Sequence, residues 1–120
     1  MNMSTTNNDG KITEIASDYV VAAKYDYVGL WQICIRVRKE LKTTSEAEIK
    51  ALVLNIIEKM LQNGLEAVTL SSSGSGCIRW EDQSARSILS RISTEWSTLG
   101  RLPSVGEIAW FDNPDTGTRS

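Results

Sequence analysis

Hydrophobic residues recur at helical spacing in three segments of this chain. The first segment covers residues 27–42, and Asp26 before it is a suitable N-cap. The second begins at Ser45, which forms a capping box with Glu48, and it ends before Gly64. Both segments predict amphipathic helices. Their stripes consist of Leu30, Ile33, Cys34, Val37 and Leu41, and of Ile49, Leu52, Val53, Ile56, Ile57, Met60 and Leu61.

The third helical segment ends at Leu99, because Gly100 and Pro103 follow it. Either Asp82 or Ser84 caps its start. Its hydrophobic stripe predicts a helix that is buried along one side. The stripe consists of Ala85, Ile88, Leu89, Ile92, Trp96 and Leu99.

Short runs of strand-forming residues cover 65–70, 77–80 and 107–111. The first two runs are joined by residues 71–76 (SSSGSG), a composition that permits a hairpin turn. A phosphate-binding P-loop needs a lysine and a following helix, and this segment has no lysine and precedes a predicted strand. Residues 71–76 therefore predict a hairpin tip.

The order of these segments predicts an α+β domain, with three helices packed on a small antiparallel sheet. A capped helix followed by a β-hairpin is winged-helix-like, as in the wing half of winged-helix domains. The pattern leaves open whether residues 11–25 form a strand of this sheet or pack as a helix. We expect Trp80, Trp96 and Trp110 to meet in one core.

Length and composition indicate one globular domain. The chain has 120 residues, of which 41% are hydrophobic, enough for a single core. We expect the domain to cover residues 11–113, with a disordered tail over 1–10 and a flexible tail over 114–120. No apolar run reaches the ~20 residues that span a bilayer, and the N-terminus lacks the features of a signal peptide. We therefore expect a cytoplasmic protein with no membrane partner.

The ionisable residues give no sign of a catalytic site. The chain has no histidine, which removes the commonest general base and the usual zinc ligand. Cys34 and Cys77 form no C-x-x-C pair, and Cys34 lies on an apolar stripe where we expect it to be buried. We therefore expect no enzyme activity, metal or cofactor. A small hydrolase or transferase with a perturbed carboxylate is a third class that the sequence leaves open.

The first predicted helix has a second, partly apolar face formed by Trp31, Ile35, Arg38 and Lys42. Tryptophan and arginine recur at binding hot spots, because each buries a large area and carries a directional polar group. This face is either a partner surface or the side on which Trp31 and Ile35 pack against residues 11–25. In the second case Arg38 and Lys42 form a solvated edge.

Several motifs resemble those of a family of small uncharacterised bacterial proteins. They are residues 26–31 (DYVGLW), 63–65 (NGL), 95–96 (EW), 99–103 (LGRLP) and 106–111 (GEIAWF), and the resemblance covers about residues 26–113. In size, acidity and lack of catalytic chemistry the chain also resembles immunity proteins of polymorphic toxin systems, such as contact-dependent growth inhibition. This resemblance implies a cytoplasmic protein that binds and neutralises a cognate toxin domain.

Our leading hypothesis is therefore a non-catalytic protein-binding module, most specifically an immunity protein. The chain is acidic, with a net charge of −2 and a pI near 5.1. If the toxin is a basic nuclease, acidic residues are predicted to steer the encounter with it. They are Glu66, Glu81, Asp82, Asp112 and Asp115.

The alternative is a winged-helix-like regulator or adaptor that contacts nucleic acid. The acidic pI argues against a dedicated nucleic-acid binder. The predicted helix before the hairpin has a solvent face that is close to neutral, and residues 71–76 carry no lysine or arginine for the phosphate backbone. The sequence leaves the oligomeric state open.

Overall fold

The structure, a computed structural model, describes residues 3–43, 45–70 and 76–114, with side chains from Asp9 onward. These residues form four helices and one antiparallel sheet, which confirms the α+β class. The elements, in chain order, are α1 Met3–Ala22, β1 Val28–Gly29, α2 Leu30–Glu40, α3 Glu46–Gln62, β2 Glu66–Leu70, β3 Cys77–Arg79, α4 Ala85–Leu99 and β4 Trp110–Asp112.

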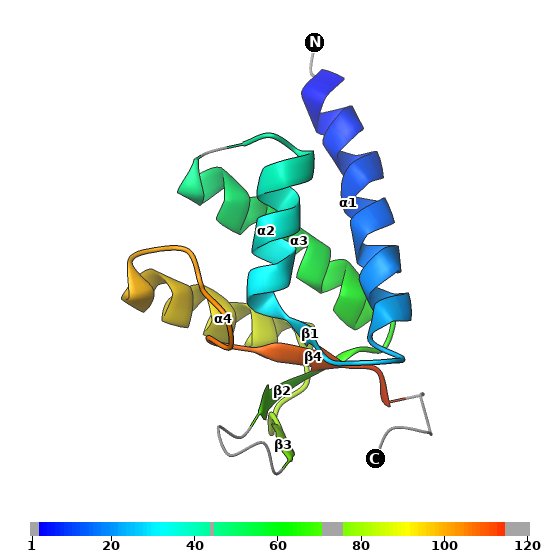
Figure 1. Ribbon diagram of the computed structural model, residues 1–120, viewed down its shortest axis with the longest axis vertical. Helices are drawn as coiled ribbons and strands as arrows, with labels where there is room; N and C mark the ends of the chain where they lie inside the picture. Colours follow the sequence, from blue (N-terminus) through cyan, green and yellow to red (C-terminus); the bar gives the residue numbers. More distant parts are fainter. Residues whose placement is uncertain (1–2, 44, 71–75, 115–120) are drawn as a thin grey trace.

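The sheet has the strand order β1-β4-β2-β3, and every neighbouring pair is antiparallel. The last strand of the chain therefore lies in the middle, between β1 and the predicted β2–β3 hairpin. Figure 1 shows α1, α2 and α3 above the β1–β4 pair, α4 beside it, and the hairpin projecting below. The helices thus leave one face of the sheet uncovered among the described residues.

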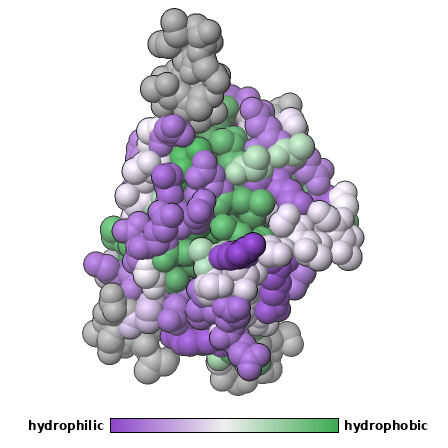
Figure 2. Space-filling view, turned by 180° about the vertical axis from the view of Figure 1, so that it is seen from behind, coloured by the Kyte–Doolittle hydropathy of each residue, from purple (hydrophilic) through white to green (hydrophobic). Residues whose placement is uncertain are grey.

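The core lies between the helices and the inner face of the sheet. It contains most of the predicted stripes of α2, α3 and α4, together with Phe111 and Ala67 from the sheet, but Ala85 and Leu99 at the two ends of α4 do not belong to it. Trp80 and Trp96 belong to it as predicted, but Trp110 does not. In Figure 2, hydrophobic residues reach the surface in the centre of the face behind the view of Figure 1, ringed by hydrophilic ones.

Local capping explains where α3 and α4 begin. The Ser45 hydroxyl accepts a hydrogen bond from the Glu48 amide at 3.2 Å, as the capping box predicts. The Glu48 carboxylate, however, accepts from the Thr43 hydroxyl. Of the two predicted caps of α4, Ser84 is the N-cap, and Asp82 accepts from the Ser84 amide at 2.9 Å.

Residues 11–25, which the sequence left open, are helical up to Ala22. Ile12 and Ile15 are buried in the core, and α1 packs against α3. The helix begins at Met3, so the structure differs here from the predicted disordered tail over residues 1–10. Burial of one side of α1 supplies the stabilisation that its polar start lacks.

The predicted helix over residues 27–42 is wrong at both ends. Val28 and Gly29 pair with β4, so α2 begins only at Leu30, and Asp26 is not its cap. The Gln32 side chain instead accepts from the Gly29 amide at 2.6 Å. At the other end α2 stops at Glu40, and Lys42 has a φ of 53°, which ends helical geometry.

The predicted strand over residues 107–111 is shorter and shifted. Ile108 has a φ of 69°, a left-handed conformation that a β-branched residue rarely adopts and that breaks strand geometry. Pairing therefore starts later, and β4 covers Trp110–Asp112.

Candidate interaction face of the sheet

The outer face of the sheet is built by alternation along its strands. Phe111 of β4 and its cross-strand partner Ala67 point into the core. Their neighbours Trp110 and Val68, which are also opposite each other, therefore point outward. Val68 has an exposed fraction of 0% although it does not belong to the core cluster.

Trp31 folds back onto this outer face. Its ring occupies the space beside Gly29, where a Cβ atom would lie only 1.7 Å from the indole. There the Trp31 ring meets the Trp110 ring edge-on, with centroids 4.8 Å apart and an interplanar angle of 78°. Both tryptophans are half-buried. The outer face thus presents two aromatic rings in fixed orientation.

A three-way ion pair continues the same face beyond Val68. Arg79, opposite Val68 on β3, donates to Glu66 and to Asp112, in each case at 2.6 Å. Glu66 and Asp112 are directly opposite each other on β2 and β4. Like charges at opposite positions repel, and the Arg79 guanidinium between the two carboxylates offsets this repulsion. Hydrogen bonding to Asp112 raises the pKa of Arg79.

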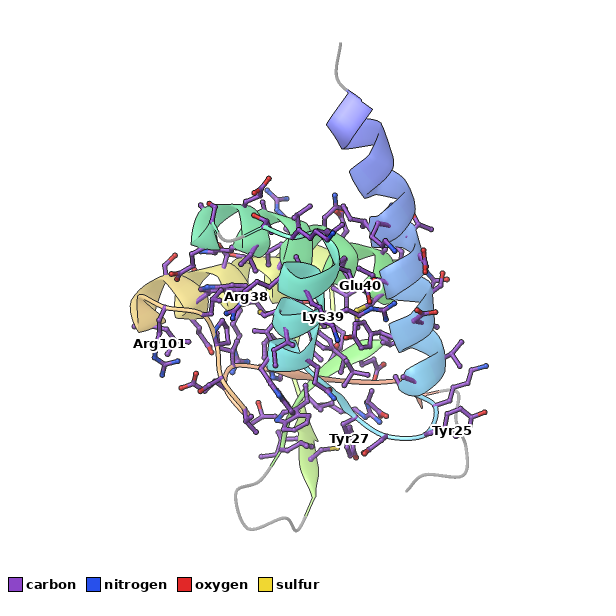
Figure 3. The ribbon with its side chains drawn as sticks, turned by 45° about the horizontal axis from the view of Figure 1, so that its top comes forward. Tyr25, Tyr27, Arg38, Lys39, Glu40 and Arg101 are labelled. Carbon is purple, nitrogen blue, oxygen red and sulfur yellow. The ribbon has the colours of Figure 1, made fainter. Side chains whose placement is uncertain are left out.

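Tyr27 borders the outer face near the hairpin (Figure 3). Its hydroxyl group donates to Cys77 Sγ at 3.4 Å, and both residues are partly buried. Tyr27, which directly precedes β1, therefore contacts β3 at the opposite edge of the sheet through its side chain.

The α2 face predicted from the sequence is exposed beyond Trp31. Ile35 has an exposed fraction of 60%, and Arg38 and Lys42 are also exposed. The side of α2 that meets α1 is a different one: Tyr19 donates to the Gln32 carbonyl at 3.2 Å, and Arg36 donates to Asp18 at 2.6 Å. Trp31 and Ile35 therefore do not pack on α1, which corrects that alternative. Figure 3 shows Arg38 on the side of α2 away from α1, toward Arg101.

The acidic residues predicted to steer a partner do not form one free patch. Glu66 and Asp112 are held by Arg79, and the Asp112 side chain has an exposed fraction of 7%. Asp82 accepts from the Ser87 hydroxyl at 2.6 Å, and these bonds to the start of α4 lower its pKa. Glu81 is exposed. Asp115 lies outside the described residues.

We name this surface the tryptophan face and define it by Trp31, Trp110, Arg79 and its two carboxylate partners on the sheet, together with Ile35, which lies one helical turn after Trp31 on α2. Sequence reasoning found Trp31, Ile35, Glu66 and Asp112. It missed Trp110, which was predicted in the core, and it missed Arg79. The alternation of Trp110 and Phe111 in one strand is the signal that separates an outward from an inward aromatic residue.

Helix α3, the counterpart of a recognition helix in the nucleic-acid hypothesis, packs against α1, α2 and α4. Its exposed positions carry acidic, amide or alanine side chains and no lysine or arginine. Lys50 is partly buried and donates to Ser97 Oγ at 2.8 Å and to the Ser93 carbonyl at 3.1 Å. Lys59, in the last turn, is also only partly exposed, so α3 offers no fully exposed cation to a phosphate.

One hollow lies between α3 and α4, with a volume of about 320 Å³. It is open and shallow, and Lys50 on its wall already donates to two oxygens of α4. Glu46, Trp96 and Gly100 also line it. The described lining residues do not place polar groups around a common point where a substrate atom could bind.

Two further properties of the described residues bear on the site. No group of three potential metal-binding side chains occurs among them. None of the helices that the structure describes has both the length and the apolar character required to cross a membrane.

Comparisons of the chain with protein-family models, with curated proteins and with solved structures found no match. The family resemblance inferred from the motifs therefore stays a prediction. The geometry of the tryptophan face is the strongest indication of function that the described residues carry.

Proposed function

We propose that this chain is a non-catalytic protein-binding module that uses the tryptophan face. The edge-on contact of Trp31 and Trp110 carries this proposal. Two half-buried rings, fixed against Gly29 and against each other, lose little conformational entropy when a partner covers them. Tryptophan and arginine are also the residues that most often dominate binding energy.

The arrangement of charge supports a protein partner. Apolar and aromatic side chains lie at the centre of the face, and Arg79 lies beside them with its carboxylates. This resembles an interface with an apolar core and a polar rim. A nucleic-acid surface would instead need unpaired cations, and Arg79 is already balanced by two acids.

Within this class we propose the narrower role of a toxin-neutralising immunity protein. Its support is the acidity of the chain and its resemblance to immunity proteins in size and chemistry. Of the predicted steering residues, Glu81 is exposed, whereas Glu66 and Asp112 also balance Arg79. Electrostatic steering by a basic toxin domain predicts association that slows as salt is added.

The test is a tagged pull-down from the native cells, with and without nuclease, read by mass spectrometry. We expect one stoichiometric protein that survives nuclease and is lost with Ile35→Ser, a fold-neutral change of an exposed side chain. Val21→Ser is the matched control, because Val21 is an exposed β-branched residue on α1. Partners that disappear with nuclease, or equal capture by both variants, would contradict the proposal.

A further inference from the structure

The two edge strands of the sheet, β1 and β3, differ in whether their outward-pointing backbone groups are hydrogen-bonded. At β1, the outward-pointing amide of Gly29 donates to the Gln32 side chain at 2.6 Å, and the chain turns directly into α2. At β3, the other edge, no side chain of the described residues bonds to the outward backbone groups. Unpaired edge groups are a template for pairing with another strand.

The hydrogen bonds between β3 and β2 show which backbone groups of β3 point away from the sheet. The Trp80 amide donates to the Ala67 carbonyl at 3.1 Å, so Trp80 pairs inward with β2. Because antiparallel pairing alternates along a strand, Ile78 also pairs inward, opposite Thr69. The amides and carbonyls of Cys77 and Arg79 therefore point to the open edge.

Because the outward groups belong to the residues on either side of Ile78, the edge of β3 can pair with the same edge of a second copy. When the two β3 strands run antiparallel with Ile78 opposite Ile78, Cys77 of each copy faces Arg79 of the other. The two Cys77–Arg79 pairs then supply two hydrogen bonds each. The two Ile78 residues form a non-hydrogen-bonded pair, the arrangement in which side chains approach most closely.

The side chains of the edge suit this pairing. Ile78 has an exposed fraction of 68%, among the most exposed large hydrophobic side chains of the described residues. The charge of Arg79 is balanced within its own copy by Glu66 and Asp112, so two arginines approach without net repulsion. The edge carries no proline or lysine, the residues that commonly block strand addition.

We propose that a second copy of this chain pairs with β3 and that the two sheets become one continuous sheet. Three residues on each side bury less area than stable dimers need, so the dimer is weak and forms as concentration rises. The two-fold axis runs through the Ile78 pair perpendicular to the sheet. Both tryptophan faces therefore lie on the same side of the joined sheet.

Sedimentation velocity over micromolar to millimolar concentrations tests this proposal on the full chain. The wild type is expected to shift from monomer to dimer. Ile78→Lys places two ammonium groups opposite each other and is expected to weaken dimerisation at least about tenfold. Val21→Lys, a change of an exposed β-branched residue on α1 outside the tryptophan face, is expected to leave dimerisation unchanged. A monomer at every concentration, or equal dimerisation of both variants, would overturn the proposal.

A cross-link gives the register. In a Cys77→Ser background, Ile78→Cys places two thiols at a non-hydrogen-bonded antiparallel pair, whose Cα separation of about 4.5 Å permits a disulfide. Mild oxidation is expected to give a covalent dimer, whereas Val21→Cys in the same background gives none. Absence of the Ile78→Cys cross-link would contradict the register. The result does not depend on any partner of the tryptophan face.

Discussion

Gly29 is the residue on which the tryptophan face depends most. Its Cβ position is filled by the Trp31 ring, so no other residue fits there without moving that ring. A side chain at this position separates Trp31 from Trp110 and also disturbs the start of α2. The requirement is steric, because Gly29 has a φ of −87°, which any residue adopts.

Gly29→Ala is therefore expected to destabilise the protein by about 1–3 kcal/mol, the usual cost of overpacking. It is also expected to change the near-ultraviolet circular dichroism of the tryptophans. Gly10→Ala is the control, because Gly10 lies within α1 with nothing near its Cβ position, and alanine favours helix by about 1 kcal/mol. Urea denaturation of both variants measures the difference. Equal stability of Gly29→Ala and the wild type would contradict the described packing.

The two cysteines differ in environment. Burial raises the pKa of the Cys34 thiol to about 12, so almost no reactive thiolate exists near neutral pH. Cys77 is only partly buried, at the sheet edge. We expect an aromatic disulfide reagent to modify one thiol of the native protein rapidly and the second only on unfolding. Cys77→Ser should remove the rapid phase; a rapid phase that persists would show that Cys34 is accessible.

At the scale of elements, Arg79 ties β3 to both β2 and β4. Glu66 and Asp112 are opposite each other, and Asp112 is nearly buried, so loss of the guanidinium leaves two close carboxylates. We expect Arg79→Ala to cost about 1–3 kcal/mol at pH 7. The loss should shrink as salt is added, because Arg79 and Glu66 are partly exposed and salt screens the repulsion between the two carboxylates.

Denaturation at several salt concentrations measures this effect. Arg86→Ala is the control, because Arg86 is exposed on α4. The ion-pair account predicts no salt-dependent loss for that variant. A loss for Arg79→Ala that is the same at every salt concentration would mean that packing of the arginine side chain, and not its charge, stabilises the sheet.

The turn after α4 is held by Arg101 and Glu107. Arg101 donates to both carboxylate oxygens of Glu107, at 2.8 and 2.7 Å, and the Ser104 amide donates to one of them at 2.8 Å. These bonds lower the pKa of Glu107 to about 2. A lowered pKa means that this interaction stabilises the fold at neutral pH and is lost as pH falls from the usual value of 4.5 toward about 2.

Arg101→Ala is expected to raise the pKa of Glu107 toward that usual value, because Arg101 is the largest cause of the shift. Titration of the Glu107 carboxyl carbon by NMR measures it directly. An unchanged pKa in the variant would assign the shift to the Ser104 amide.

At the scale of the whole molecule, the helices and the hairpin follow from the sequence because their signals are local. The stripes of α2, α3 and α4 and the caps at Ser45 and Ser84 each involve residues within a few positions of one another. The sequence does not decide between strand and helix for α1, because its polar first turns lack such a signal and its burial against α3 is a tertiary effect.

The tryptophan face was only partly predictable for the same reason. Trp31 and Trp110 lie far apart in the sequence and meet only because β4 inserts between β1 and β2. Strand order depends on long-range pairing, which periodicity does not encode. The left-handed conformation of Ile108 also places the start of β4 later than the sequence predicts. The register of β4 that results decides that Trp110 points outward and Phe111 inward.

The most direct test of the central claim is a calorimetric titration of the captured partner with Trp110→Ala and Ile35→Ser, beside the control Val21→Ser. Thermal unfolding first establishes that each variant is folded. The tryptophan face predicts that each of the first two changes weakens binding by about tenfold or more, while the control binds as the wild type does. Affinities of all three variants within about twofold of the wild type would contradict the claim that this face binds the partner.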